Sequence, residues 1–287
     1  MSSVNRRGVT LVELLASLAL FGVIAAAALS TLATNQRMQS ALRQHTDLQQ
    51  NIRAAANLFP AELRELDAVD GDISAISASS ITIRAMRRLG FACDPPPLGA
   101  SLDNLGMTIR AHPYFGTRDF RTGDSLLVFY EGNPDARTDD SWARGVVIAT
   151  SSESCPDGAA GRRLVVGLTL SAAQPNSPGA IARGAPVRGF EPVTYHAYSA
   201  ADGKWYLGLR TGSGLQPVVG PLTGGDGLRL DYYDRDGAVT DAPASVALVE
   251  IRLRATTAKP THRSGSTPGV LVDSVATTVA LRNNRRF

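Results

Sequence analysis

The sequence is poor in the residues that most catalytic and metal sites need. Its two cysteines, Cys93 and Cys155, belong to no Cys-x-x-Cys pair and are too few for a structural zinc site. It also lacks a His-Glu-x-x-His motif, a Gly-x-Ser-x-Gly nucleophile elbow and a glycine-rich phosphate loop with its lysine. These absences favour a chain that is not an enzyme and that holds no cofactor.

An excess of charge of one sign is missing as well. The chain has 29 basic and 26 acidic residues, and Arg6 and Arg7 lie in its first eight positions, so removing those eight leaves 29 − 2 = 27 basic residues and a net charge of +1. No broad basic face follows from such a balance, which weighs against a dedicated nucleic-acid-binding protein. Arg282, Arg285 and Arg286 near the C-terminus leave two interpretations open, contact with DNA or a solvated tail.

A long apolar run stands near the N-terminus. Residues 9–33 contain one charged residue, Glu13, and as a helix of about 37 Å they would span a hydrocarbon core. Arg6 and Arg7 precede the run without an acidic residue, which favours a cytoplasmic N-terminus and a chain that continues across the membrane. A secretory signal peptide would have a shorter apolar region with a small-residue cleavage site at its far end. The pattern predicts a single-pass protein whose residues 69–287 lie outside the cytoplasm.

Glu13 is costly in this position. A carboxylate in lipid costs about 3 kcal/mol on insertion scales, and the apolar run contains no basic residue to offset it. Cleavage after Gly8 would create an α-amino group on Val9, one helical turn from Glu13. The carboxylate would then pair with its own N-terminus or with that of a neighbouring helix. The alternative is a simple signal anchor with Glu13 near the lipid headgroups.

The residues around this position carry a resemblance. Arg6-Arg7-Gly8 followed by Val-Thr-Leu-Val-Glu-Leu-Leu resembles the class III signal of type IV prepilins and pseudopilins. The resemblance implies that a prepilin peptidase cuts between Gly8 and Val9 and methylates the amine of Val9. It also implies that Glu13 recruits the subunit into a filament by pairing with a neighbour's N-terminus.

The helix is predicted to continue beyond the membrane through residues 34–68. Apolar residues recur there at spacings of three and four, an amphipathic stripe that should pack on a folded domain. Pro60 removes a backbone donor and disfavours a helical Phe59, so we expect a kink or restart near Pro60. The stripe consists of Met38, Leu42, His45, Leu48, Ile52, Ala55, Phe59 and Leu63.

From residue 69 onward the pattern is typical of β-structure. Runs rich in Val, Ile, Leu, Tyr and Thr alternate with glycines and prolines, and an Ala-Asp-Gly turn predicts a hairpin of 193–199 with 204–210. The predicted fold class is α+β, a long N-terminal helix packed on a mainly antiparallel β domain, as in pilins. Further strands are expected at 80–86, 125–130, 144–149, 163–168, 228–234, 246–256 and 270–281.

Two features of the β region invite functional interpretations. If this region lies outside the cytoplasm, Cys93 and Cys155 should form a disulfide, and two unrelated buried thiols are the alternative. Asp231, Asp234 and Asp236 precede a glycine, but the EF-hand spacing fails. A hairpin turn is the favoured interpretation of these aspartates, with a different calcium site as the weaker candidate.

A fainter resemblance extends to the C-terminal region. Segments 205–207, 228–237 and 277–283 resemble those of the larger minor pilins of the PilW kind and of the J-type minor pseudopilins of type II secretion. The resemblance implies a minor subunit of the bacterial inner membrane and periplasm that assembles into, primes or caps a type IV pilus-like filament. The implied partners are prepilin peptidase, other pilins or pseudopilins and an assembly platform protein. The alternatives are a type II secretion pseudopilin, a tip adhesin or DNA-uptake subunit, and an exported enzyme that uses the signal as an anchor.

Overall fold

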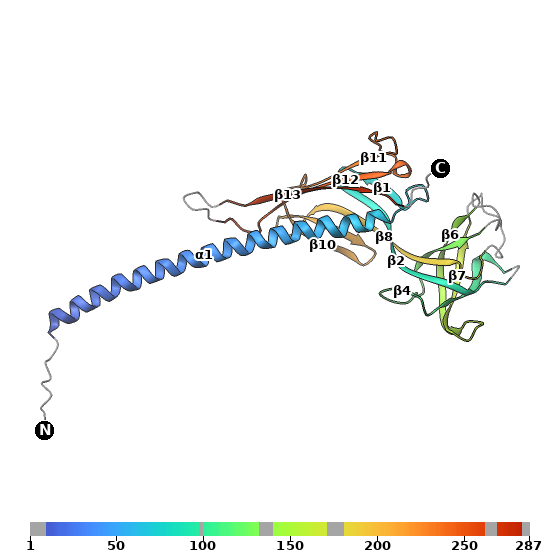
Figure 1. Ribbon diagram of the computed structural model, residues 1–287, viewed down its shortest axis with the longest axis horizontal. Helices are drawn as coiled ribbons and strands as arrows, with labels where there is room; N and C mark the ends of the chain where they lie inside the picture. Colours follow the sequence, from blue (N-terminus) through green and yellow to red (C-terminus); the bar gives the residue numbers. More distant parts are fainter. Residues whose placement is uncertain (1–9, 98–99, 132–139, 171–180, 262–268, 283–287) are drawn as a thin grey trace, which may run out of the picture.

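The computed structural model describes residues 10–97, 100–131, 140–170, 181–261 and 269–282. In these residues one long helix is followed by thirteen strands, paired antiparallel throughout (Figure 1). The α+β fold class is therefore confirmed. The elements are α1 (Leu11–Arg64), β1 (Ile73–Ser77), β2 (Ser80–Asp94), β3 (Leu105–Arg110), β4 (Phe115–Gly116), β5 (Ser125–Tyr130), β6 (Ser141–Ser154), β7 (Ala160–Thr169), β8 (Pro186–Ser199), β9 (Trp205–Thr211), β10 (Gly214–Leu222), β11 (Leu228–Tyr233), β12 (Leu248–Thr256) and β13 (Val272–Ala280).

The stripe on α1 is only partly covered by the β domain. From Leu48 to Leu63 it is buried against the strands. The prediction is wrong for the membrane-proximal part, because Met38 and Leu42 are each 60% exposed and His45 is also exposed. The buried part of the stripe begins at Leu48; before it, the domain lies beside the helix without covering the stripe, as in the bond of 3.1 Å from the Lys259 N–H to Gln44 Oε1, and the N-terminal part of the helix projects beyond the domain (Figure 1).

The predicted restart at Pro60 does not occur. α1 is assigned as one helix with Pro60 inside it, and it ends at Arg64. Packing on both sides of the proline offsets the missing backbone hydrogen bond. Phe59 lies against Tyr195 with ring centroids 4.6 Å apart, and Glu62 accepts hydrogen bonds of 2.7 Å from both the Tyr195 hydroxyl and Arg87. Burial and the neighbouring Glu62 raise the pKa of Tyr195 well above its usual range, so the phenol stays a donor.

One connected sheet encloses two hydrophobic cores in the described part of the chain. The helix-side core packs α1 against β1, the first half of β2, the second half of β8 and the strands from β9 to β13. The barrel core lies inside a closed ring in which β2, β3, β7, β6, β5 and β8 pair in turn and β8 pairs again with β2. β2 and β8 are thus the strands that contribute to both cores. The barrel, which the sequence did not predict, lies beyond the C-terminal end of α1 (Figure 1).

The parts of the fold built around these two cores, the helix-side lobe and the barrel, meet at an irregularity in β2. The register between β2 and β8 shifts between Met86 and Arg88, which is the signature of a β-bulge. The two arginines at this point bond to different lobes. Arg87 bonds to Glu62 of α1, whereas Arg88 lies 3.4 Å from Asp124 in the barrel. The bulge therefore marks the change from the helix-side core to the barrel.

All nine predicted strands are present, but β1, β3, β4 and β10 were not predicted. β10 contains Pro217 and Pro221, which argue against a strand. The two prolines are tolerated because β10 pairs along its length with β9 only. Its other neighbour, β12, pairs with it at Leu222 alone. A proline costs no ladder hydrogen bond where its nitrogen faces an unpaired edge. The predicted hairpin is confirmed as β8 and β9, with Gly203 at φ 74° in the turn.

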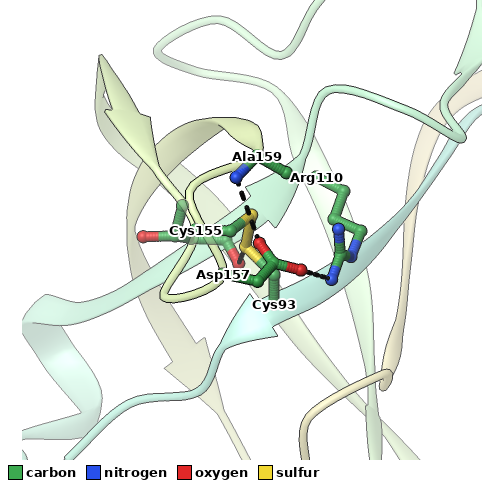
Figure 2. The surroundings of a disulfide bond; sticks show 6 residues. Cys93, Arg110, Cys155, Asp157 and Ala159 are labelled. Atoms are coloured by element: carbon green, nitrogen blue, oxygen red, sulfur yellow. Dashed lines mark hydrogen bonds and ion pairs between the residues drawn. A yellow bond between two sulfur atoms is a disulfide. The ribbon is translucent and has the colours of Figure 1, made fainter.

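A disulfide between Cys93 and Cys155 cross-links two strands of the barrel, which confirms the predicted pairing. Cys93 lies near the end of β2 and Cys155 in the turn that follows β6, and both are buried (Figure 2). Asp157 holds the turn by accepting hydrogen bonds from the Ala159 N–H at 3.1 Å and from Arg110. The bond ties the tip of the β6–β7 hairpin to the opposite strand of the barrel.

We predict that the Cys93→Ser/Cys155→Ser variant unfolds more easily than the wild type. The bond joins residues 62 positions apart, and the chain-entropy model gives a stabilisation of up to about 4 kcal/mol for a loop of this size. Urea unfolding of the full chain in detergent measures the difference, with reduced wild type as the control. Equal stability of the oxidised and reduced protein would refute the prediction.

Candidate functional site

The N-terminus of α1 is built around Thr10 and Glu13. Thr10 is the N-cap, and its hydroxyl accepts a hydrogen bond of 3.3 Å from the Glu13 N–H. Glu13 Oε2 in turn accepts hydrogen bonds of 3.0 Å from the backbone N–H and from the hydroxyl of Thr10. This reciprocal pair is a capping box, and it places the carboxylate at the positive end of the helix dipole.

The sequence offers Glu13 no basic partner within the apolar run, and the structure adds neutral hydrogen-bond donors from Thr10. Thr10 supplies two donors to one carboxylate oxygen. The signal was present in the sequence as Thr-x-x-Glu directly before an apolar run. These neutral donors satisfy hydrogen bonds but leave the negative charge uncompensated, so an ionic partner is still required in lipid.

The predicted cut at Gly8 and Val9, and the leader charges Arg6 and Arg7, lie outside the described residues. The helix that follows them is described from Leu11 onward. The roles of Gly8, Val9, Arg6 and Arg7 therefore stay predictions from the sequence.

The first part of α1 is apolar and uncovered. The stretch that is apolar and long enough to cross a membrane contains no buried residue. Its large side chains Leu11 and Phe21 are 76% and 70% exposed. The hydroxyl groups in this part donate to helix carbonyls one turn back, for example Ser17 to Glu13 at 2.7 Å and Thr31 to Ala27 at 2.9 Å. With these groups satisfied internally, the surface suits lipid or another helix.

A groove continues this apolar surface onto the folded domain. It has a volume of about 750 Å³ and lies between residues 34–49 of α1 and the start of β13. Met38 and Leu42 line one side and Leu271 and Val272 the other. The uncovered part of the helix stripe is one wall of this groove.

The three aspartates proposed for calcium are divided between two roles. Asp231 on β11 forms ion pairs with Arg229 at 3.3 Å and Arg252 at 3.4 Å. Asp234 Oδ1 accepts hydrogen bonds of 2.9 Å from the N–H groups of Asp236 and Ala238. Within the described ranges no group of three or more His, Cys, Asp or Glu residues could hold a metal ion. Asp234 acts as a turn residue.

The C-terminal arginines are represented by Arg282 alone, since Arg285 and Arg286 lie outside the described residues. The Arg282 N–H donates to the carbonyl oxygen of Arg64 at 2.9 Å, and its guanidinium lies 3.8 Å from Glu65. These contacts hold the start of the C-terminal tail at the end of α1.

We predict that Asp234→Ala lowers the free energy of unfolding by about 1 kcal/mol, because two turn hydrogen bonds are lost. Asp236→Ala is the matched control, since in the described residues no hydrogen bond to its side chain is present. Thermal unfolding in calcium and in EDTA should give the same midpoint. A midpoint that rises with calcium in the wild type and not in Asp234→Ala would restore the calcium interpretation.

Comparison with known proteins adds one match. The family model for the prokaryotic N-terminal methylation motif matches residues 4–29, which include the predicted cut, Glu13 and most of the apolar run. A search of curated proteins and a search of solved structures each found no match. The N-terminal segment is thus identified as the class III, prepilin-type signal of type IV pilin-like proteins.

Proposed function

We propose that this chain is a minor pilin or pseudopilin that prepilin peptidase processes after Gly8 and that then assembles into a type IV pilus-like filament. The proposed topology places the N-terminus in the cytoplasm and the β lobes in the periplasm of a bacterial inner membrane. An assembly platform protein and other pilins or pseudopilins are its proposed partners. A type II secretion pseudopilus would use the same features.

The proposal rests on the apolar half of α1. This half projects from the folded domain, and none of the described residues covers it. Such a surface is stable in lipid before assembly and among like helices afterward. The groove beside Met38 and Leu42 extends the surface toward the domain, so a neighbouring helix would bury both regions together.

Glu13 would fix the position of the subunit along the filament. Thr10 orients the carboxylate through hydrogen bonds but leaves its charge in place. A methylated amine at the N-terminus of a neighbouring helix would supply the positive charge. Pairing in a medium of low dielectric would favour the one axial offset at which charge and amine meet.

The barrel supports a position at the filament tip. It lies beyond the C-terminal end of α1, displaced to one side of the helix axis (Figure 1). In a filament of parallel, staggered helices, the domains of earlier subunits occupy the space ahead of each subunit. A subunit with a second lobe in this space fits best as the first or priming subunit. Its 279 residues after cleavage (287 − 8) also suit a minor subunit better than one present in many copies.

Gly8→Ala should block removal of the leader, which mass spectrometry of the membrane-bound protein would show as retention of residues 1–8. Gly22→Ala is the matched control, because a Cβ at Gly22 would meet no atom within 4 Å. Normal processing of Gly8→Ala would show that the cut lies elsewhere.

Glu13→Gln should leave cleavage intact but lower incorporation into filaments by about tenfold or more, the factor that corresponds to a loss of about 1.4 kcal/mol. The amide keeps an acceptor for Thr10 and removes the charge. Asp47→Asn, at an exposed position of the same helix, is the charge-matched control. Wild-type incorporation of Glu13→Gln, measured in sheared filament fractions, would contradict the role of Glu13.

A further inference from the structure

The outer surface of the barrel carries two arginines stacked on aromatic rings. Leu127 of β5 lies opposite Arg144 of β6 on one side and opposite Arg188 of β8 on the other. Their Cα atoms are therefore roughly 10 Å apart, two strand spacings. Side chains at these positions point away from the barrel core, which is filled by the alternate residues Leu126 and Val128.

The two arginines cross over the strand between them. Arg188 of β8 lies over the ring of Trp142 on β6, with Cζ 4.3 Å from the ring centroid. Arg144 of β6 lies in the opposite sense over Phe190 of β8, at 5.6 Å. Leu127 is consequently only 4% exposed although it faces outward. We call these residues (Leu127, Trp142, Arg144, Arg188 and Phe190) the arginine face. Stacking fixes both guanidinium groups before any ligand arrives.

Neither guanidinium of the arginine face has an acidic partner among the residues that the structure describes. Five other arginines of the barrel, in contrast, each form an ion pair with a carboxylate. They are Arg88 and Arg118 with Asp124, Arg110 with Asp157, Arg162 with Asp119 and Arg163 with Glu153. Arg144 and Arg188 are thus preorganised cations whose counter-charge the described chain does not supply.

The surroundings favour a protein as the source of that counter-charge. Val146 and Ile148, which continue the same strand beyond Arg144, are 48% and 46% exposed. Exposed aliphatic groups beside Trp and Arg anchors are typical of protein interfaces. A nucleic acid would need a wider basic surface. The five barrel arginines named above do not provide it, because carboxylates already pair with them. A sugar would need open aromatic faces, whereas Arg188 covers Trp142 and Arg144 covers Phe190.

We propose that the arginine face is a docking site for an acidic segment of a partner protein. Carboxylates of this segment would bind Arg144 and Arg188, and its aliphatic side chains would cover Val146 and Ile148. Bidentate bonds between guanidinium and carboxylate would set its register across the three strands. The site lies on the barrel beside its junction with the helix-side core, since Phe190 pairs with Met86 at the bulge and Arg84 also lies over the Phe190 ring, at 5.5 Å. Binding at this site does not itself depend on filament assembly.

The test uses the full chain in a non-ionic detergent and a fluorescein-labelled peptide of repeating Glu-Glu-Val-Val. This repeat places glutamate and valine alternately on each face of an extended chain. Fluorescence anisotropy should show binding that weakens as salt rises, and the peptide with lysine in place of glutamate should not bind. Arg144→Gln/Arg188→Gln should weaken binding by about tenfold or more.

Arg121→Gln is the matched control, because it removes the same charge from an exposed barrel arginine outside the face. Arg188→Lys should weaken binding although the charge is kept, since lysine lacks the planar fork. Non-reducing electrophoresis and thermal unfolding confirm that each variant retains the disulfide and the fold.

Three outcomes would overturn the proposal. The first is no binding of the glutamate peptide at low salt, and the second is equal binding by the wild type and the double variant. The third is tighter binding of oligo(dT) or polygalacturonate than of the peptide, with the same dependence on Arg144 and Arg188, which would assign the face to a nucleic acid or an acidic polysaccharide. A chain that fails to assemble but binds the peptide would refute the proposed function alone.

Discussion

The pairing of β2 with β8 is the interaction on which the rest of the fold depends. It runs from Ser80 opposite His196 to Phe91 opposite Pro186, and both strands contribute to the helix-side core and to the barrel core. The bulge between Met86 and Arg88 divides this ladder into one part that borders the helix-side core and one part that borders the barrel core. Because the strands are shared, the barrel is attached through a continuous hydrogen-bonded ladder and not through a flexible linker. Its position relative to α1 is thereby defined.

The same arrangement separates two surfaces that have no partner among the residues that the structure describes. At one end, the apolar half of α1 is exposed and contains a single charge, Glu13, which Thr10 holds by hydrogen bonds without neutralising it. On the barrel, the arginine face presents two cations that have no carboxylate partner among the described residues. The first surface is suited to lipid and like helices, and the second to an acidic ligand in water. A chain with these two unlike surfaces on separate parts of the fold is suited to join an assembly through α1 and to contact a partner through the barrel.

Local pattern predicted the elements best where one face of an element is covered along its length. β5 was predicted with its observed bounds, and the hairpin of β8 and β9 was found from its turn. The misses have physical causes. The expectation of a kink or restart at Pro60 came from the proline alone, and the restart does not occur because contacts with the sheet through Phe59 and Glu62, which local sequence does not reveal, hold the helix there. β10 was hidden by prolines that its lightly paired edge tolerates.

The sequence by itself determined the N-terminal signal, the apolar helix, the cost of placing Glu13 in lipid and the predominance of antiparallel strands, and it favoured a disulfide between the two cysteines, which the structure contains. These follow from composition, period and compartment, which are local or additive properties. Only the tertiary structure decided that the strands form two lobes, that the stripe on α1 is uncovered before Leu48, and that Arg144 and Arg188 cross above Leu127. These features depend on which distant strands pair and in what register, because register alone brings residues of three separate strands onto one face.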